Sequence, residues 1–435
     1  MSPRPRQLHL NLFGLGSGRH EAAWRHPDAD PVTASGPAAY IRLTRLAERG
    51  KFDALFLADS PWAGPLVGDS VRGGFEPLTL LSVLSAHTEH IGLIATSSTT
   101  YNDPYTVARA FASLDQLSGG RSGWNIVTTS EPPVAANFSS EPHPPHEQRY
   151  ERSIEFTDVV LELWDSWEHG VVLGDKASGR YADLTKVREI GHKGKHFSVR
   201  GPLNVPRSPQ ERPLLVQAGS SDRGRGFAAK YADAIFTAQP LLAGAQELYA
   251  DFRRRAVLAG RPADAVKILP GCCPVIGGTE AEAHALLAEL NALIVPEFAI
   301  ANLKNITGID LSEYDLDDQL PEQLGDEAGF QGLTSRLKAV LSLAAGQTLT
   351  VRQLLEQFAA GFGHRVIVGA PEQIADQLQH WFEHGAADGY NVMPALNPAG
   401  LEAFVEHVVP LLQRRGIFRT DYEGTTLRSH YDAEL

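Results

Sequence analysis

The sequence predicts an α/β fold, a (β/α)8 TIM barrel with insertions. Short apolar segments alternate with helical segments along much of the chain, which is typical of a parallel sheet covered by helices. One segment, 122–130 (SGWNIVTTS), is apolar where it starts and ends in three hydroxyl residues. This suits a barrel whose strand tips build a site, although a buried strand that ends in a Ser/Thr loop fits the pattern equally well. A barrel takes about 250 residues and the chain has 435, so insertions or a second domain must account for the rest.

The first half of the barrel is expected from four strands and their helices. Asp103 and Pro104 suit the N-cap and the first position of one helix, and Gly50 suits the end of another. The predicted strands lie at 8–14, 52–59, 91–98 and 122–130, and the predicted helices lie at about 38–49, 77–87, 104–117 and 147–168.

The second half repeats the alternation less regularly. Two segments, 169–212 and 279–365, do not fit it, and structureless loops of such length are uncommon unless they are functional. We interpret both as insertions above the barrel mouth, within one domain that spans residues 1–435. The remaining strands are predicted at 213–221, 234–238, 266–277 and 389–395, with a helix over 371–384.

Composition excludes several classes of protein. The net charge is −13, from 39 basic and 52 acidic residues, which argues against a nucleic-acid surface. Cys272 and Cys273 are adjacent, so we expect two buried thiols in a strand and no disulfide. We find no apolar run of the roughly 18 residues that a membrane span needs and no signal peptide. These features favour a cytoplasmic protein with no membrane partner.

Polar residues stand near the carboxyl ends of three predicted strands. Asp59 ends the second, Thr96 lies in the third and Asn125 lies in the fourth. Leaving a buried amide such as that of Asn125 without partners would cost about 1–3 kcal/mol, so either neighbouring backbone or a ligand must satisfy it. The structural alternatives for the other two are a helix cap or salt bridge for Asp59 and a Ser/Thr turn for Thr96.

Two helix starts could bind an anion. His146 and Tyr150 are four residues apart at the start of a long helix, so they share one face. Ser220 and Ser221 follow a strand and precede a short helix, whose free N–H groups favour a phosphate. The alternatives are a surface histidine near a cap and a serine that serves only as a cap.

Two familiar motifs are incomplete. Segment 14–19 (GLGSGR) follows a strand, but a dinucleotide loop G-x-G-x-x-G would need glycine at Arg19. A zinc-binding H-E-x-x-H starting at His20 would need histidine where Trp24 stands, so we expect no metal site. His20 and Trp24 are instead candidates to face a substrate, or they belong to a packed loop. His364 is a further candidate, although a lone histidine is more often structural.

Nine segments in one order resemble the bacterial luciferase-like superfamily of flavin-dependent monooxygenases. The nearest branch contains nitrilotriacetate, EDTA and dibenzothiophene-sulfone monooxygenases and a pristinamycin synthase subunit. The segments are HEAAWRHP (20–27), FDALFLAD (52–59), ATSSTTY (95–101), SGGRSGWNIVTTS (118–130), HEQRYER (146–152), LWDSW (163–167), QAGSS (217–221), GAPEQIAD (369–376) and QRRGIFRTDYEGTTLR (413–428).

The resemblance implies a cofactor, a partner and a reaction. A separate NAD(P)H:flavin reductase would supply FMNH2, whose reaction with O2 gives a C4a-peroxyflavin that oxygenates a small organic substrate. The protein would bind and orient the flavin and exclude water. A homodimer or higher homo-oligomer is implied as well, whereas the substrate is not defined. The implied FMN contacts are Asp59, Thr96, Asn125, His146, Tyr150, Ser220 and Ser221.

Two other functions fit the same barrel. A deazaflavin-dependent oxidoreductase would transfer hydride without oxygen, although the SGWNIVTTS segment argues against it. A non-catalytic flavin-binding or light-emitting relative would not consume oxygen in response to a substrate. A nicotinamide dehydrogenase is disfavoured by the incomplete glycine motif.

Overall fold

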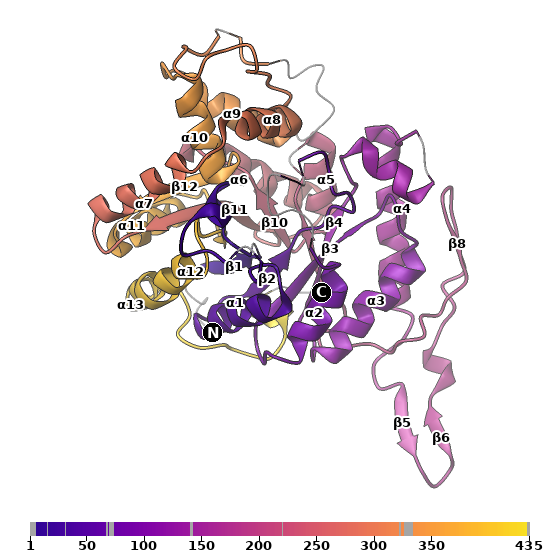
Figure 1. The fold of residues 1–435 in the computed structure, drawn as a ribbon. Helices are drawn as coiled ribbons and strands as arrows, with labels where there is room; N and C mark the ends of the chain where they lie inside the picture. Colours follow the sequence, from indigo (N-terminus) through magenta and orange to yellow (C-terminus); the bar gives the residue numbers. More distant parts are fainter. Residues whose placement is uncertain are drawn as a thin grey trace.

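A barrel of eight parallel strands forms the centre of the molecule, as the sequence predicts (Figure 1). The pairings run β1-β2-β3-β4-β9-β10-β11-β13, and β13 pairs with β1, which closes the barrel. The strands are β1 (His9–Phe13), β2 (Ala54–Leu57), β3 (Gly92–Ser98), β4 (Ser122–Val127), β9 (Leu214–Gln217), β10 (Ala234–Thr237), β11 (Lys267–Ile276) and β13 (Gly389–Val392). The computed structural model describes residues 6–14, 16–30, 32–66, 68, 74–139, 142–219, 221–321, 323–325 and 334–432.

Helices cover the outside of the barrel, and local sequence signals set where they begin. The side chain of Asp103 accepts hydrogen bonds from the N–H groups of Tyr105 and Thr106, and Pro104 is the first helical residue of α3. The outer helices are α1 (Pro37–Arg49), α2 (Pro77–Ser85), α3 (Pro104–Leu117), α4 (His146–Trp164), α5 (Asp222–Tyr231), α6 (Leu242–Leu258), α11 (Pro371–Glu383), α12 (Ala399–Ala403) and α13 (Val409–Arg414).

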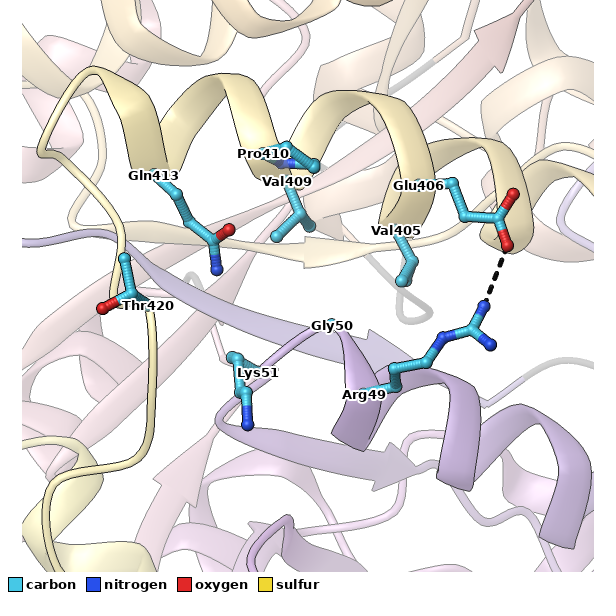
Figure 2. A pocket seen from close by; sticks show the side chains of 9 residues that line it. All are labelled: Arg49, Gly50, Lys51, Val405, Glu406, Val409, Pro410, Gln413 and Thr420. Carbon is cyan, nitrogen blue, oxygen red and sulfur yellow. Dashed lines mark hydrogen bonds and ion pairs between the residues drawn. The ribbon is translucent and has the colours of Figure 1, made fainter.

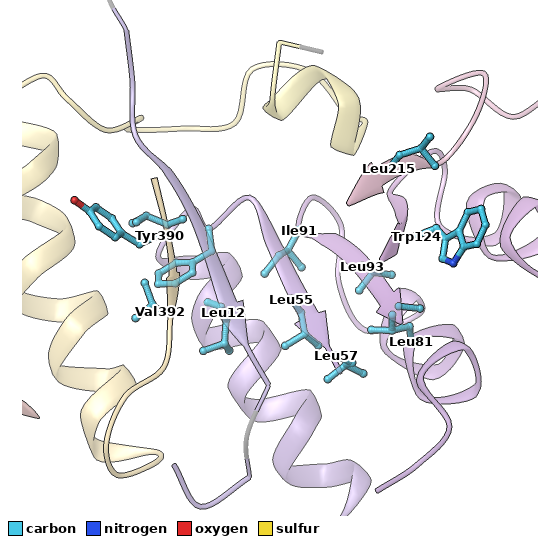
Figure 3. Close-up of a cluster of buried hydrophobic side chains, with 14 of the residues drawn as sticks. Leu12, Leu55, Leu57, Leu81, Ile91, Leu93, Trp124, Leu215, Tyr390 and Val392 are labelled. Carbon is cyan, nitrogen blue, oxygen red and sulfur yellow. The ribbon is translucent and has the colours of Figure 1, made fainter. Parts of the chain in front are cut away.

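Side chains alternate between the barrel wall and its interior. Outward residues of the strands pack against the helices in the largest apolar cluster, which includes Leu12, Leu55 and Trp124 (Figure 3). Inward residues form a second cluster. Within the barrel the rings of Phe13, Phe56 and Phe236 lie 5.4–5.7 Å apart, centroid to centroid. This aromatic trio gives the barrel an apolar centre.

The C-terminal segment fills the amino-terminal end of the barrel. Leu427, in the short helix α14 (Leu427–His430), lies where side chains on Gly92 and Gly123 would otherwise stand. The ring of Tyr431 stacks on His9 at 4.7 Å, and its hydroxyl donates to Asn11 Oδ1 at 2.7 Å. The barrel is therefore packed at this end, and a ligand site is left to the carboxyl ends of the strands.

A buried ion pair holds this segment in place. Asp53 is fully buried, and its carboxylate accepts from Arg419 at 2.5 Å, from the N–H of Leu10 at 2.7 Å and contacts His9 at 3.1 Å. Burial alone would raise the pKa of Asp53, but the charge of Arg419 and the contact with His9 lower it overall. Asp53 therefore stays ionised and joins the first strands to the tail.

The segment 169–212 forms two antiparallel hairpins. β5 (Val172–Asp175) pairs with β6 (Arg180–Ala182), and β7 (His192–Lys193) pairs with β8 (Ser198–Val199). The β5–β6 hairpin projects from the body of the molecule (Figure 1). The side chain of Glu155 in α4 accepts from the N–H groups of His196 and Phe197, which fastens the second hairpin to the barrel.

The segment 279–365 forms helices with an apolar cluster of their own. It contains α7 (Glu280–Ala292), α8 (Pro296–Thr307), α9 (Thr334–Ala344) and α10 (Val351–Gly361). α10 meets the loop that follows β1, because the N–H of Glu21 donates to Ala359 O at 3.0 Å. The helices thus stand over the carboxyl end of the barrel. No single described helix is long and apolar enough to cross a membrane, and the pair α7 and α8 passes that test only together, bent by 92°.

A ninth strand, β12 (Arg365–Gly369), extends the sheet above the barrel. β11 pairs with β10 through Lys267–Pro270 and with β12 through Cys272–Ile276. The long β11 therefore connects the barrel to the helical insertion. Cys272 and Cys273, both buried free thiols, lie where the pairing changes.

We expect Asp53→Asn to lower the free energy of unfolding by about 3–5 kcal/mol, because Arg419 would keep its buried charge without a carboxylate. Arg49→Gln is the control, since it removes an exposed pair with Glu406 at 2.9 Å and should cost less than about 1 kcal/mol. Urea unfolding followed by tryptophan fluorescence measures both. Equal losses in the two variants would contradict the role of Asp53.

Candidate functional site

Thr96 and Asn125 lie side by side at the carboxyl ends of β3 and β4. The two residues are register partners, and Asn125 Nδ2 donates to Thr96 Oγ1 at 2.8 Å. Both are buried, with exposed fractions of 4% and 3%. In the part of the chain that the structure describes, Asn125 Oδ1 has no hydrogen-bond partner. Because such an acceptor is costly to bury, it indicates a place for a ligand that donates a hydrogen bond.

The turn after β4 is held by a residue that the sequence analysis did not single out. Arg149 of α4 is buried, and its guanidinium donates to the carbonyl oxygens of Thr128, at 3.1 Å, and of Thr129. Thr129 has a left-handed backbone, with φ of 43°. Arg149 therefore fixes the hydroxyl-rich end of β4. The sequence contains one signal for Arg149, since an arginine on the buried face of a helix requires hydrogen-bond acceptors close by.

His146, Tyr150 and Ser221 come together where α4 meets the start of α5. The rings of His146 and Tyr150 lie 4.8 Å apart. Ser221 is the N-cap of α5, and its Oγ accepts from the N–H of Gly224 at 3.1 Å. A Cβ built on Gly224 would lie 2.8 Å from the Tyr150 hydroxyl, so glycine is needed for this close approach. Ser220 lies outside the described residues.

The acid at this helix start is neutralised by its neighbours. Asp222 forms an ion pair with Arg255 at 2.5 Å. Arg223 pairs with Glu147, and Arg225 pairs with Asp251 at 2.8 Å. The carboxylate of Asp222 is thus held in an ion pair, away from the N-cap of α5. The start of α5 keeps the positive end of a helix of ten residues, which favours an anion.

Asp59 follows β2 and is exposed, at the same end of the barrel as Thr96 and Asn125. The surrounding protein removes part of its hydration, and the carboxylates of Glu76 and Glu131 add negative charge. Both effects raise the pKa of Asp59, because they destabilise the carboxylate relative to the neutral acid.

His20 is packed into the protein. Its ring is buried, Nδ1 accepts from the N–H of Ala22 at 3.2 Å, and Nε2 donates to Asn291 Oδ1 at 3.0 Å. Burial lowers the pKa of His20 to about 4. Both ring nitrogens are therefore engaged, which fits a neutral histidine that fastens the loop after β1 to α7. Trp24 lies nearby in a short helix, Ala23–Arg25, and is partly buried.

His364 lies in the upper part of the barrel interior. Its ring stacks on Phe236, with centroids 5.0 Å apart and planes 8° from parallel. A Cβ on Gly271 of β11 would lie 2.2 Å from His364 Nδ1, so the ring occupies the space of a missing side chain. Burial, with the charges of Arg336 and Arg19, holds the pKa of His364 well below its ordinary value. It is a neutral residue next to two cations.

A hollow at the other end of the molecule is separate from this site. It is lined by residues that include Arg49, Lys51, Glu406 and Gln413 (Figure 2). Arg49 and Lys51 precede β2, so the hollow lies at the amino-terminal end of the barrel. None of these lining residues lies at the strand tips, so the hollow takes no part in the chemistry of the candidate site.

Comparison with known proteins finds relatives that match nearly the whole chain. The chain is 48% identical to N-acetyl-S-(2-succino)cysteine monooxygenase of Bacillus subtilis (strain 168), over 100% of this chain and 98% of that protein. It is 45% identical to nitrilotriacetate monooxygenase component A of Aminobacter aminovorans, over 98% and 96%. The crystal structure of a riboflavin lyase with modified FMN and riboflavin superposes with a TM-score of 0.87 and 33% identity, over 98% and 95% of the two chains.

The sequence profile of the luciferase-like monooxygenases matches residues 21–388, which include the barrel strands from β2 to β11 and the helical insertion. The family that the sequence motifs resemble is thereby confirmed. The chain belongs to the luciferase-like monooxygenase family.

Proposed function

We propose that this enzyme is the oxygenase component of a two-component system, which uses FMNH2 and O2 to insert one oxygen atom into a small organic substrate by way of a C4a-peroxyflavin. The observation that carries the proposal is the unpartnered amide oxygen of Asn125, buried beside Thr96 at the strand tips. The relative named as component A of a monooxygenase and the lyase structure that contains modified FMN support it.

The residues present fit FMN at two separate places. Asn125 Oδ1 would accept a hydrogen bond from a ring N–H of the flavin, and Thr96 would lie beside it. Ser221, with His146 and Tyr150, would hold the phosphate at the start of α5, where glycines 219 and 224 allow close approach. Asp59, at the end of β2, would lie next to Thr96 on the side away from the phosphate groups. Ser220 remains a predicted phosphate contact from the sequence.

Bound reduced FMN supplies the electrons that activate oxygen. The protein itself binds the flavin, orients it and shields it from water. Arg149 fixes the turn after β4, so the hydroxyl groups of Thr128 and Thr129 stand at set positions. The insertion helices cover the strand tips, which would keep water from the reacting groups.

The partner and the substrate follow from the same proposal. No second cofactor domain lies in the described chain beside the barrel and its insertions, so a separate NAD(P)H:flavin reductase would deliver FMNH2. The substrates named for two relatives, N-acetyl-S-(2-succino)cysteine and nitrilotriacetate, are the first compounds to test. Deazaflavin-dependent hydride transfer is the second candidate, and a flavin-binding protein without oxygenase activity is the third.

Self-association is part of the proposal, because the β5–β6 hairpin exposes apolar side chains far from the barrel. Leu173 and Tyr181 have exposed fractions of 47% and 69%, and Leu184, just after the hairpin, is 79% exposed. An isolated two-stranded hairpin is only marginally stable in water, so contact with another copy would stabilise it. We expect a homodimer or a higher homo-oligomer.

The function is tested by oxygen uptake with a flavin reductase, NADH, FMN and each candidate substrate. Substrate-dependent uptake with formation of an oxygenated product supports an oxygenase. Tight deazaflavin binding with no uptake favours hydride transfer. In Asn125→Ala we expect FMN affinity to fall about tenfold or more, since one buried hydrogen bond is worth about 1–3 kcal/mol.

Asn391→Ala is the matched control for the Asn125 variant. Asn391 is also a buried amide inside the barrel, but its Nδ2 donates to Leu269 O at 3.0 Å and its Oδ1 accepts from Asn11. Its loss should lower the midpoint of urea unfolding and leave FMN affinity nearly unchanged. An Asn125 variant that binds FMN like wild type would remove the main support for the proposal.

A pair of glycine substitutions tests the phosphate end. Gly224→Ala would place a methyl group 2.8 Å from the Tyr150 hydroxyl, whereas nothing lies within 4 Å of the Cβ position at Gly226 in the same helix. We expect Gly224→Ala to weaken FMN binding about tenfold, or about 1.4 kcal/mol, and to leave riboflavin binding unchanged. Gly226→Ala should bind both flavins as wild type does. Equal effects on FMN and riboflavin would argue against a phosphate at this helix.

Charge placed on the hairpin tests self-association. We expect Leu173→Lys combined with Tyr181→Lys to shift the protein toward the monomer in size-exclusion chromatography with light scattering, because like charges and lost apolar area weaken a contact between copies. Lys176→Glu, on the same hairpin, is the control and should not shift the mass. An unchanged mass in the double variant would place the contact elsewhere.

A further inference from the structure

Tyr101 and His143 form a short hydrogen bond in the loops above β3 and β4. The Tyr101 hydroxyl lies 2.5 Å from His143 Nδ1. The Tyr101 ring stacks on Phe138, with centroids 5.0 Å apart and planes 12° from parallel. Phe138 ends the short helix Pro132–Phe138, and His143 lies in the loop just before α4. Three segments of the chain therefore hold the phenol and the imidazole in one arrangement.

The direction of this hydrogen bond follows from the partners at hand. Within the described residues, His143 is the only hydrogen-bond partner of the Tyr101 hydroxyl, and a phenol needs an acceptor for its proton. Burial and the charge of Arg149 lower the pKa of His143, which keeps the imidazole neutral at neutral pH. A neutral imidazole that accepts at Nδ1 carries its own proton on Nε2.

The Nε2 proton of His143 has no acceptor. This nitrogen is buried and, across the part of the chain that the structure covers, unpartnered; Nε of Arg149 is in the same condition. The charge of Arg149 acts on both Tyr101 and His143, so the three groups lie close together. Buried donors without acceptors are costly, so they indicate that an oxygen of a bound molecule comes to this place during function.

The Tyr101–His143 pair borders the proposed flavin site. Thr100 Oγ1 donates to Thr128 O at 2.8 Å, which joins the loop after β3 to the turn after β4. Tyr101 is the next residue, and Arg149 donates to the same carbonyl oxygen at 3.1 Å. Asn125, whose amide would meet the flavin ring, lies three residues before Thr128 on β4. The pair thus stands over the strand tips at which oxygen would react.

We propose that His143 donates a proton from Nε2 to the oxygen that is reduced at the strand tips, and that Tyr101 holds His143 in the donating form. The proposal deepens the proposed function and rests on it for the flavin and for O2. His143 would touch the reacting oxygen, which makes it a catalytic residue. Tyr101 acts through His143 and is a positioning residue.

Electrons and protons balance in this step. Without a substrate, FMNH2 and O2 give FMN and H2O2, so two electrons and two protons pass from flavin to oxygen. His143 supplies one proton from Nε2 and takes the hydroxyl proton of Tyr101 at Nδ1. One flavin proton then returns to Nε2, the hydroxyl proton returns to Tyr101, and the other flavin proton goes to oxygen. With a substrate, one oxygen atom is transferred and the other leaves as water.

The charge of Arg149 supports this exchange at the tyrosine. Burial raises the pKa of the Tyr101 hydroxyl, and the positive charge of Arg149 opposes that rise. The phenolate that forms while His143 holds the hydroxyl proton is therefore stabilised by a fixed cation. The same cation favours a negatively charged oxygen near His143 Nε2.

NMR of the flavin-free protein with isotope-labelled histidine tests the pair without turnover. We expect His143 to carry its proton on Nε2. Tyr101→Phe should shift the Nδ1 resonance, because it removes the hydroxyl donor and keeps the ring on Phe138. Tyr105→Phe is the matched control, since its hydroxyl lies 3.5 Å from Pro202 O, and should leave His143 unchanged. A wild-type His143 with its proton on Nδ1 would overturn the proposal.

Oxidation of protein-bound FMNH2 by O2, followed by the absorbance of oxidised flavin in a stopped-flow instrument, tests the proton step. We expect His143→Ala to slow oxidation by about tenfold or more, as loss of a general acid does, and added imidazole to restore part of the rate. Tyr101→Phe should slow it less and should not respond to imidazole. His20→Ala is the control, because His20 is packed against Asn291 and imidazole should not change its rate.

Three kinetic or binding results would contradict the role of His143. A His143→Ala protein that oxidises FMNH2 as fast as wild type has no proton donor at this position. A slower rate that imidazole does not restore would leave His143 a structural residue. Lost FMN affinity with riboflavin binding intact would assign Nε2 to the cofactor phosphate.

Failure of the proposed function gives a different pattern. Oxidation of FMNH2 would depend on His143 and respond to imidazole as expected, while every candidate substrate stays unchanged and all consumed oxygen appears as H2O2. In that case the proton donor stands and the oxygenase function falls.

Discussion

The ion pair between Asp53 and Arg419 decides which end of the barrel is closed. Asp53 stands at the start of β2, and Arg419 belongs to the C-terminal segment that delivers Leu427 and Tyr431 into the barrel. A parallel barrel has two mouths, and both cannot be packed if it is to hold a ligand. Because the tail fills the amino-terminal mouth, the strand tips carry the open one, and every candidate site residue depends on that choice.

The open mouth has two unlike walls. On one wall, Thr96, Asn125 and the start of α5 offer neutral hydrogen-bonding groups and a helix terminus, which suit a flavin ring and a phosphate. On the other wall, the insertion contributes Arg336 beside Arg19. Under the proposed function, the barrel builds the wall that would hold the flavin, and the insertion builds much of the opposite wall.

Local signals in the sequence were enough to predict the barrel. Strand alternation located all eight barrel strands, and Asp103 with Pro104 located the start of α3. The pairing of Thr96 with Asn125 also follows from the register of neighbouring parallel strands. Arg149 and Arg336 were not predicted, because arginine on a helix is usually a solvated surface residue. Only the tertiary structure distinguishes the two from surface arginines, because it packs Arg149 against Thr129 and Arg336 against Phe362.

The sequence by itself determined the fold class, the order of the strands, the helix caps and the family, because each depends on residues close together or on motifs in a fixed order. The tertiary structure alone decided that His20 bonds to Asn291, that the tail plugs one mouth, and that Arg19 and Arg336 meet at Phe362. These contacts join residues far apart in the chain, and no local periodicity records them. Each contact forms because a buried polar group requires a partner, and that partner can come from a distant part of the chain.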